Sequence, residues 1–362
     1  MDSILFSPIR IGSVEIPNRF VRSATHDFMA NDDGSITERQ TLLYKNLAQG
    51  EIGLIITGHV YVSPHGKASP FQTGIHDDSL IKGLKRITEA VHCYPGRVFL
   101  QLSHAGRQTK PRLCKCTPLA PSPVFEPTFK VMPKEMNSND ISRVIEDFIQ
   151  AGQRAKKAGF DGVQLHLAHG YLLSSFISPY TNRRQDTWGG PLENRVRIII
   201  EILRGIKSTL GEEFPVIIKL NSTDFLPEGL GLSESIRIAK ILEEEGVDGI
   251  EVSGGMAEAG KGSVWKGIRS EDEEGYFVQN AARIKSAVAV PVTGLGGIRS
   301  FSVMEKFVTE GKVDLISMSR PFIRDPFLIK KYHQGETKKA ECISCNKCFN
   351  LRGIRCVELE CN

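Results

Sequence analysis

Residues 162–184, GVQLHLAHGYLLSSFISPYTNRR, begin as an apolar run and continue into a loop with many polar side chains. The run 162–168 has the length and composition of a buried β-strand, and His166, His169 and Tyr171 gather at and beyond its C-terminal end. Such a strand is typical of an active site on a parallel α/β scaffold. One histidine or tyrosine alone would more often belong to the core, but three close together favour a functional site. The loop ends in three further polar residues, Asn182, Arg183 and Arg184.

Seven other short apolar runs resemble this one, and segments of helical period separate several of them. Gly or Pro borders most runs, which lie at 20–25, 53–58, 97–103, 162–168, 215–221, 248–254, 291–296 and 314–320. Apolar residues recur at three- and four-residue spacing in 79–94, 138–159, 193–211, 233–246, 278–288 and 301–311. Eight βα units predict an α/β chain folded as a closed (β/α)8 TIM barrel. A doubly wound open sheet is the alternative.

Three segments lie outside this regular pattern. Residues 4–16 alternate around Gly12 and predict an N-terminal hairpin that covers the bottom of the barrel. The long insertion at 104–137 is rich in Pro and Lys, and we expect it to form part of a lid over the substrate. We therefore expect two parts, a barrel over residues 1–335 and a Cys-rich tail over 336–362.

Composition and charge exclude several classes of partner. The net charge of +4 on 362 residues includes no basic block of the kind that follows a nucleic-acid backbone. The N-terminus carries Asp2 where a secretory signal needs basic residues, and no apolar stretch is long enough to span a membrane. Five of the eight cysteines crowd into the last 21 residues, unlike a secreted disulfide framework. We expect a cytoplasmic protein that binds neither nucleic acid nor membrane.

The carboxyl ends of barrel strands meet at one mouth, so the residues that follow each run can be compared directly. The earlier ends supply Thr25, Gly58, His59 and Gln101, whereas the last ends are dominated by glycine and serine. Glycines expose backbone N–H groups, and such barrels often bind phosphate after strands seven and eight. The set that predicts a phosphate site is Gly294, Gly296, Gly297, Ser319 and Arg320. No dinucleotide fingerprint follows the first strand and no P-loop occurs, so the phosphate should belong to a ligand bound by the barrel.

Lys219 lies inside the otherwise apolar run PVIIKLN, and Gln101 is placed similarly in RVFLQLS. A buried lysine needs an anionic or strongly polar partner. A cation beside an amide suits a planar ring with a donor and acceptor edge that gains negative charge, such as the pyrimidine side of a reduced flavin. The alternative is a polar layer inside the barrel that pairs Lys219 with a carboxylate such as Glu251.

These residues resemble the old yellow enzyme family of flavin-dependent ene-reductases, to about residue 335. The resemblance rests on PNRFVRSAT (17–25), QLSHAGR (101–107), 166–195, IKLNSTDF (218–225), EVSGG (251–255) and SRPFIRDP (319–326). It implies a (β/α)8 barrel that holds FMN, with Gln101 and Lys219 at the flavin pyrimidine edge. It also implies that Ala24, Thr25 and Gly58 line the ring and that Gly296, Gly297, Ser319 and Arg320 hold the phosphate.

The same resemblance implies roles for the residues of the opening segment. His166 and His169 would bind the carbonyl oxygen of an α,β-unsaturated substrate while hydride from reduced flavin adds to the β-carbon. Tyr171 would donate the proton to the α-carbon. NADH or NADPH would reduce the flavin in the same mouth before the substrate enters.

Two positions depart from the common family pattern. His26 stands where many members carry Thr or Cys, and we expect it to line the substrate site near the flavin. Phe28 replaces a tyrosine with which some members contact substrate, which removes one hydrogen bond.

The tail carries Cys342, Cys345 and Cys348 at C-x2-C-x2-C spacing, followed by Cys356 and Cys361. With either Cys356 or Cys361 as fourth ligand, the three could hold a [4Fe–4S] cluster. The segment resembles the cluster segment of trimethylamine dehydrogenase and 2,4-dienoyl-CoA reductase. By this resemblance, the cluster would pass electrons to or from FMN and to a redox partner protein. Free thiols or an adventitious zinc site are the alternatives. The tail thus makes an amine dehydrogenase or an electron-transfer flavoprotein the rival function. The sequence leaves open whether the chain forms a homo-oligomer.

Overall fold

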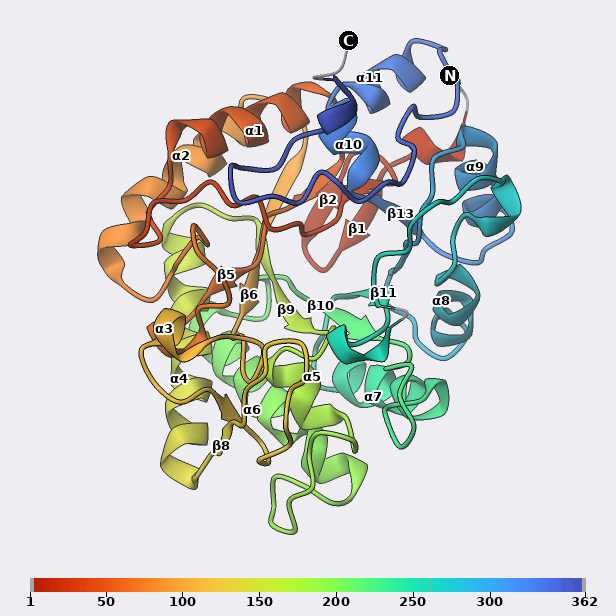
Figure 1. Cartoon of the computed structure of the whole chain (residues 1–362). Coiled ribbons are helices and arrows are strands. Elements are labelled where there is room, and N and C mark those ends of the chain that lie inside the picture. The colour runs from red at the N-terminus through yellow and green to blue at the C-terminus, as the bar shows by residue number, and fades with distance from the viewer. Residues whose placement is uncertain (1–2, 261, 360–362) are drawn as a thin grey trace.

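Eight parallel strands close into a barrel in the computed structural model, which describes residues 3–260 and 262–359 (Figure 1). Each strand pairs with the next, and pairing of Leu54 with Arg97 and of Val21 with Leu54 helps to complete the ring. In order around the ring the strands are β3 (Phe20–Arg22), β4 (Leu54–Ile56), β6 (Arg97–Ser103), β9 (Gly162–Leu167), β10 (Val216–Asn221), β11 (Gly249–Ser253), β12 (Val292–Gly294) and β13 (Leu315–Met318). The predicted TIM barrel is confirmed, with most strands trimmed at their ends. A short strand, β5 (Val60–Tyr61), pairs with the end of β6.

Helices surround the barrel and bury their apolar faces against it (Figure 1). They are α1 (Glu38–Gln49), α2 (Ile81–His92), α4 (Ser138–Lys157), α6 (Leu192–Leu210), α7 (Leu232–Glu244), α8 (Val278–Lys285) and α9 (Phe301–Thr309), with the shorter α5 (Leu172–Ile177), α10 (Arg320–Arg324) and α11 (Leu328–His333). Helix α1 is missing from the sequence prediction because ERQTLLYKNLAQ has a weak apolar period. A capping box, in which Thr37 and Gln40 each bind the other's backbone N–H, fixes its start.

The N-terminal hairpin covers the bottom of the barrel, as predicted. Its strands β1 (Ile9–Ile11) and β2 (Val14–Ile16) follow a short 3₁₀ helix, η1 (Ile4–Phe6). Ile11 and Ile16 pack against the lower interior residues of the barrel, which are apolar: Val21, Leu54, Ile56, Phe99, Ile217 and Leu315. An apolar cluster therefore fills the lower interior of the barrel, and the polar side chains that line the cavity lie at the opposite end.

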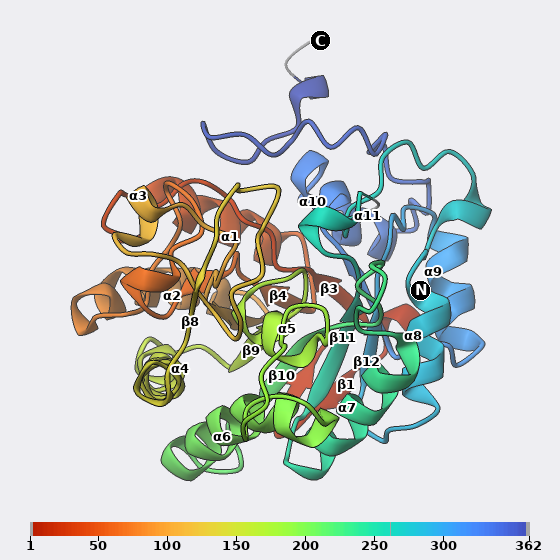
Figure 2. The same cartoon turned by 60° about the horizontal axis from the view of Figure 1, so that its bottom comes forward.

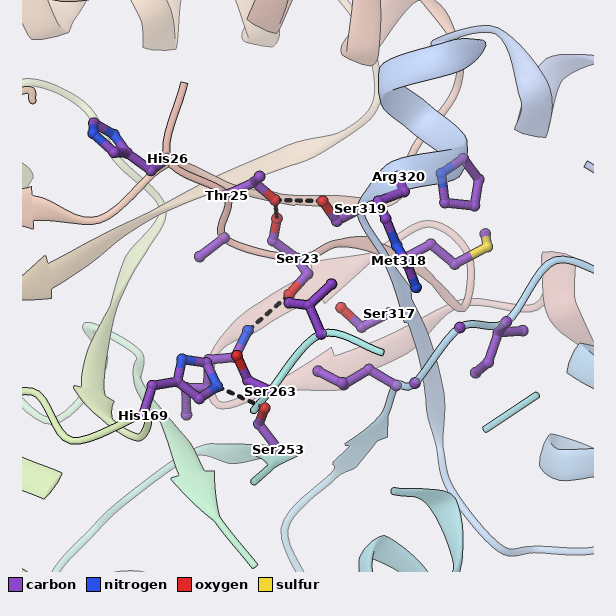
Figure 3. A pocket seen from close by; sticks show the side chains of 18 of the residues that line it. Ser23, Thr25, His26, His169, Ser253, Ser263, Ser317, Met318, Ser319 and Arg320 are labelled. Atoms are coloured by element: carbon purple, nitrogen blue, oxygen red, sulfur yellow. Dashed lines mark hydrogen bonds between the residues drawn. The ribbon is translucent and has the colours of Figure 1, made fainter. Parts of the chain in front are cut away.

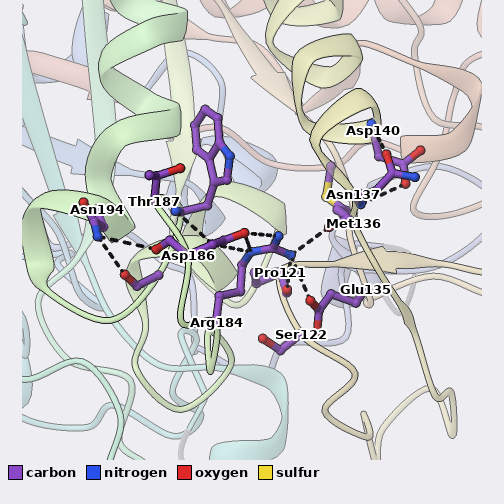
Figure 4. A network of polar contacts seen from close by, with 12 residues as sticks. Pro121, Ser122, Glu135, Met136, Asn137, Asp140, Arg184, Asp186, Thr187 and Asn194 are labelled. Atoms are coloured by element: carbon purple, nitrogen blue, oxygen red, sulfur yellow. Dashed lines mark hydrogen bonds and ion pairs between the residues drawn. The ribbon is translucent and has the colours of Figure 1, made fainter.

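The long loop after β6 contains more structure than its sequence indicated, with α3 (Pro111–Cys114) and the paired strands β7 (Leu119–Ala120) and β8 (Lys134–Glu135). Arg184 holds this loop in place (Figure 4). Its Nη1 donates to the carbonyl oxygens of Pro121 at 3.0 Å and Met136 at 2.7 Å, and its Nη2 donates to Asp186 at 2.5 Å. Asn182 likewise binds backbone carbonyls. The last polar residues of the opening segment thus support loops and do not join the histidines.

The segment after α11 lies across the mouth end of the barrel (Figure 2). Ala340 N donates to Arg299 O at 3.0 Å, and Ile354 N donates to Asp27 O at 2.8 Å, so the segment reaches from the β12 side to the β3 side. A short 3₁₀ helix, η6 (Val357–Leu359), ends its described part. The division of the chain at residue 335 stays a prediction. Within the described residues, no helix has the length and apolar character needed to cross a bilayer.

Candidate active site

A cavity of about 220 Å³ opens at the carboxyl ends of the barrel strands (Figure 3). Most of the residues singled out from the sequence line it, although they come from six strands and their loops. These are Ala24, Thr25, His26, Gln101, His166, His169, Tyr171, Lys219, Gly296, Gly297, Ser319 and Arg320. The barrel therefore brings together side chains that lie up to about 300 positions apart along the chain, as expected for a TIM-barrel mouth.

A chain of polar contacts crosses the upper interior of the barrel. Lys219 Nζ donates to Ser23 Oγ at 2.8 Å and lies 3.3 Å from Glu251 Oε2. Gln101 donates to Gln164 at 2.7 Å, and Gln164 in turn donates to Glu251 at 3.0 Å. Burial alone would raise the pKa of Glu251, but the charge of Lys219 and hydrogen bonds to the carboxylate hold it below its ordinary value.

The polar layer and the cavity wall are thus one structure. Lys219 is paired with Glu251, as the alternative interpretation of the sequence proposed, and it also lines the cavity. Gln164 did not emerge as a candidate from the sequence. Its signal is the two-residue period of a strand, since it lies two positions before His166 on the same face of β9.

His166 and His169 lie side by side, with ring centroids 5.2 Å apart. His169 Nε2 is 2.8 Å from Ser253 Oγ (Figure 3). His166 Nδ1 is buried without a partner among the described residues. Burial, together with the charge of Lys219, lowers the pKa of both rings well below the usual value, so both are neutral at pH 7. His169 also has a left-handed backbone with φ of 65°, which is uncommon outside glycine and frequent at functional sites.

Tyr171 lies against this pair, with its ring centroid 4.7 Å from that of His166. Burial raises the pKa of its hydroxyl to about 12, so the group is protonated at neutral pH. His59 completes the cluster, since its ring centroid is 5.1 Å from that of Tyr171, and burial lowers its pKa to about 4. Its position after the second predicted strand was visible in the sequence, but nothing there distinguished it from a core histidine.

The two positions that depart from the family pattern lie together. His26 lines the cavity and its Nε2 is 2.5 Å from Ser69 Oγ. The ring centroids of Phe28 and His26 are 3.8 Å apart, with the ring planes tilted by 41°. Phe28 itself does not line the cavity, and neither does Gly58. Gly58 lies behind Thr25, where an added Cβ would come within 2.8 Å of the Thr25 carbonyl oxygen. Both residues therefore act on the cavity through their neighbours.

The opposite end of the cavity is cationic. Gly296 and Gly297 turn the chain with φ of 129° and 69°, conformations that favour glycine. Thr25 Oγ1 and Ser319 Oγ are 2.6 Å apart beside this turn. Arg299 and Arg320 line the cavity here, whereas Lys219 lines it next to the histidines. No Asp or Glu lines the cavity among the residues that the structure describes. This distribution fits a ligand with a phosphate at one end, as FMN has.

The tail cysteines line a second, smaller hollow of about 20 Å³ next to Arg320. Cys342, Cys345, Cys348 and Cys356 all contribute to it, while Cys361 lies outside the described residues. In the part of the chain that is described, no three Cys, His, Asp or Glu side chains are close enough to bind one metal ion. The thiols therefore gather in one place without forming a closed metal site.

Comparisons with known proteins agree with this geometry. The family model for NADH:flavin oxidoreductase / NADH oxidase matches residues 4–339. The NADH oxidase of Thermoanaerobacter brockii is 40% identical over 361 residues, which cover 99% of this chain and 55% of that protein. The structure of 2-naphthoyl-CoA reductase in complex with 2-naphthoyl-CoA superposes with a TM-score of 0.91 at 30% identity, over 95% of this chain and 54% of that one. The old yellow enzyme homologue of Zymomonas mobilis has a TM-score of 0.80 at 27% identity, over 92% and 94%.

The chain thus spans about half the length of that NADH oxidase and of the naphthoyl-CoA reductase, and nearly all of the old yellow enzyme homologue. The resemblance inferred from the sequence motifs is confirmed across the barrel. By sequence and by fold, the chain belongs to the NADH:flavin oxidoreductase / NADH oxidase family.

Proposed function

We propose that this chain is an FMN-dependent enzyme that uses NADH or NADPH to reduce the C=C bond of α,β-unsaturated carbonyl compounds. One observation carries the proposal. His166, His169 and Tyr171 form one wall of a cavity whose far end is cationic and free of carboxylates among its described lining residues. Such a cavity can hold a flavin phosphate at one end and a neutral carbonyl substrate at the other.

The residues suited to FMN are the cationic and small ones. Lys219 and Gln101 would meet the polar edge of the ring, where Lys219 can balance the negative charge that reduction adds. Ala24 and Thr25, with Gly58 behind them, would lie along the ring, and Gly296, Gly297, Ser319 and Arg320 would bind the phosphate. Bound and reduced FMN would supply the hydride that adds to the substrate β-carbon.

The histidines and the tyrosine divide the remaining work. A neutral imidazole carries one N–H. With the Ser253 hydroxyl donating a hydrogen bond to His169 Nε2, the N–H of His169 would be on Nδ1. His166 has a free Nδ1, so two N–H groups are available for one carbonyl oxygen. They would stabilise the charge that develops on this oxygen, and Tyr171 would protonate the α-carbon.

Two half-reactions test this proposal. The purified chain should show a flavin absorption spectrum that bleaches anaerobically with NADH or NADPH and returns when cyclohexenone is added. A protein without any flavin spectrum would refute the cofactor assignment. A flavin that NAD(P)H reduces but that no enone reoxidises would refute the substrate class.

The rival function is an amine dehydrogenase or electron carrier that passes electrons through a tail cluster to a redox partner protein. The observation in its favour is the hollow lined by four cysteines, whose thiols are the donors that a [4Fe–4S] cluster requires. The pairing of His166 with His169 argues against amine oxidation, since two imidazole N–H groups suit a carbonyl oxygen better than an amine. A cluster is compatible with either function, so the two questions are separate.

Anaerobic purification with iron and sulfide analysis tests the cluster. We expect about four iron atoms and four sulfides per chain, lost in Cys345→Ala and retained in Cys93→Ala, whose thiol is exposed at the end of α2. Cys356→Ala and Cys361→Ala then identify the fourth ligand. Iron-free protein with intact flavin would leave the tail as free thiols.

A further inference from the structure

The tail reaches the cationic end of the cavity and not only its rim. Arg299 Nη1 donates to Cys342 O at 2.8 Å, and Gly267 N donates to Ser344 O at 3.1 Å. The residue after Gly267, Ile268, accepts a bond from Arg299 Nη2 at 2.7 Å and lies against Gly297. Ser344 therefore lies beside the glycine turn, and it lines the cavity together with Cys342 and Phe349.

Ser344 is unusual in two ways. Its side chain is 1% exposed, and its hydroxyl has no hydrogen-bond partner among the described residues. Its backbone is also left-handed, with φ of 57°, a conformation that a residue with a Cβ adopts at a cost. A buried hydroxyl without a partner is unfavourable as well. No hydrogen bond within the described chain compensates for burial of the Ser344 hydroxyl.

Arg299 is the barrel residue that the tail contacts at this end of the cavity. Its two terminal nitrogens bind the Ile268 and Cys342 carbonyls, and its Nε forms an ion pair with Glu274 Oε1 at 3.7 Å. The Arg299 side chain is buried and lines the same cavity. The unpartnered Ser344 hydroxyl and the Arg299 side chain thus both line the end of the cavity where a phosphate is expected.

We propose that the tail completes the cofactor site, with the Ser344 hydroxyl as a donor to the phosphate monoester of the flavin. This inference rests on the proposed FMN dependence and adds the tail to the binding site. Because the tail would contact the ligand, FMN binding and ordering of the cysteine segment are thermodynamically linked, and each must favour the other by the same factor.

Riboflavin provides the test, since it has the same ring as FMN but no phosphate. The flavin is removed reversibly from the full chain, and the affinities for FMN and riboflavin are measured by fluorescence quenching. Ser344→Ala should weaken FMN binding by about tenfold, the value of one hydrogen bond to a charged group, and leave riboflavin binding unchanged. Ser286→Ala is the control, because Ser286 is exposed at the end of α8, at the opposite end of the barrel.

A second variant separates ligand binding from folding. Ser344→Gly removes the hydroxyl but suits the left-handed backbone, so the tail should be at least as stable as in the wild type while FMN affinity falls as in Ser344→Ala. Unchanged FMN affinity in both variants would overturn the proposal. So would an equal loss for FMN and riboflavin, which would show an effect on the ring site. A wild-type chain that binds neither flavin would instead refute the cofactor assignment.

The alkylation rate of Cys345 tests the linkage between FMN binding and ordering of the tail. In iron-free protein, FMN should slow alkylation of Cys345 more than riboflavin does, because only FMN would order the tail through its phosphate. Cys345 lines the second hollow and not the flavin cavity, so direct shielding by the ring does not explain such protection. Exposed Cys93 should react equally in all samples. Equal rates at Cys345 with the two flavins would contradict the linkage.

Discussion

His169→Ala is expected to lower kcat/KM for cyclohexenone by about 10²- to 10³-fold, the usual cost of removing one donor to a developing oxyanion. Reduction of the flavin by NAD(P)H should be unchanged, because that step develops no charge on the substrate carbonyl. Stopped-flow measurement of the two half-reactions separates these effects. His166→Ala should behave in the same way, since its Nδ1 is the buried donor site left without a partner.

The double variant shows whether the two rings act on one atom. If both rings bind the same oxygen, the fold-loss of kcat/KM in the double variant should be smaller than the product of the two single losses. The reason is that the first substitution already weakens binding of that oxygen by the other ring. His333→Ala is a suitable control, as that side chain is 55% exposed and pairs with Glu51 on the outside of the barrel. Equal losses in both half-reactions would instead place the histidines at the flavin or the nicotinamide.

The barrel could be predicted from the sequence because each strand is a short apolar run with clear borders, and the topology follows from eight repeats. The mouth could be predicted for the same reason, since the carboxyl ends of parallel strands must converge. This is why residues as distant as His26 and Arg320 were placed in one cavity correctly. Their individual roles remain predictions, because convergence gives position and not chemistry.

Other features depend on long-range contacts that no local pattern records. Arg299 reaches the cavity through the packing of the loop after β12. Arg184 ends the segment 162–184 that carries His166 and His169, yet it binds the carbonyls of Pro121 and Met136 in the distant insertion. The tail has no periodicity to indicate which face of the barrel it covers. Its contacts with Arg299 and Gly267 appear only in three dimensions.

Tyr171→Phe is expected to slow reoxidation of the flavin by enones by about 10²- to 10⁴-fold, the range for loss of a general acid. The reductive half-reaction should keep its rate, because hydride transfer from NAD(P)H to flavin needs no proton from this residue. In the wild type, a pKa of about 12 keeps the Tyr171 hydroxyl protonated through the neutral and moderately alkaline range. The oxidative half-reaction should therefore lose no rate to deprotonation of Tyr171 until strongly alkaline pH, and a fall near neutrality would identify another acid.

Tyr180→Phe is the matched control for this substitution. Tyr180 lies on the same segment but does not line the cavity. Its ring centroid lies 6.0 Å from the Arg107 guanidinium, and phenylalanine preserves this ring contact. The other nearby groups are poor substitutes for Tyr171, since His59, with a pKa of about 4, is neutral at pH 7 and holds few protons to give. Water entering the open mouth would then be the remaining source, and a solvent isotope effect that grows in Tyr171→Phe would support that route. If Tyr171→Phe slows both half-reactions equally, the hydroxyl shapes the cavity and does not protonate the substrate.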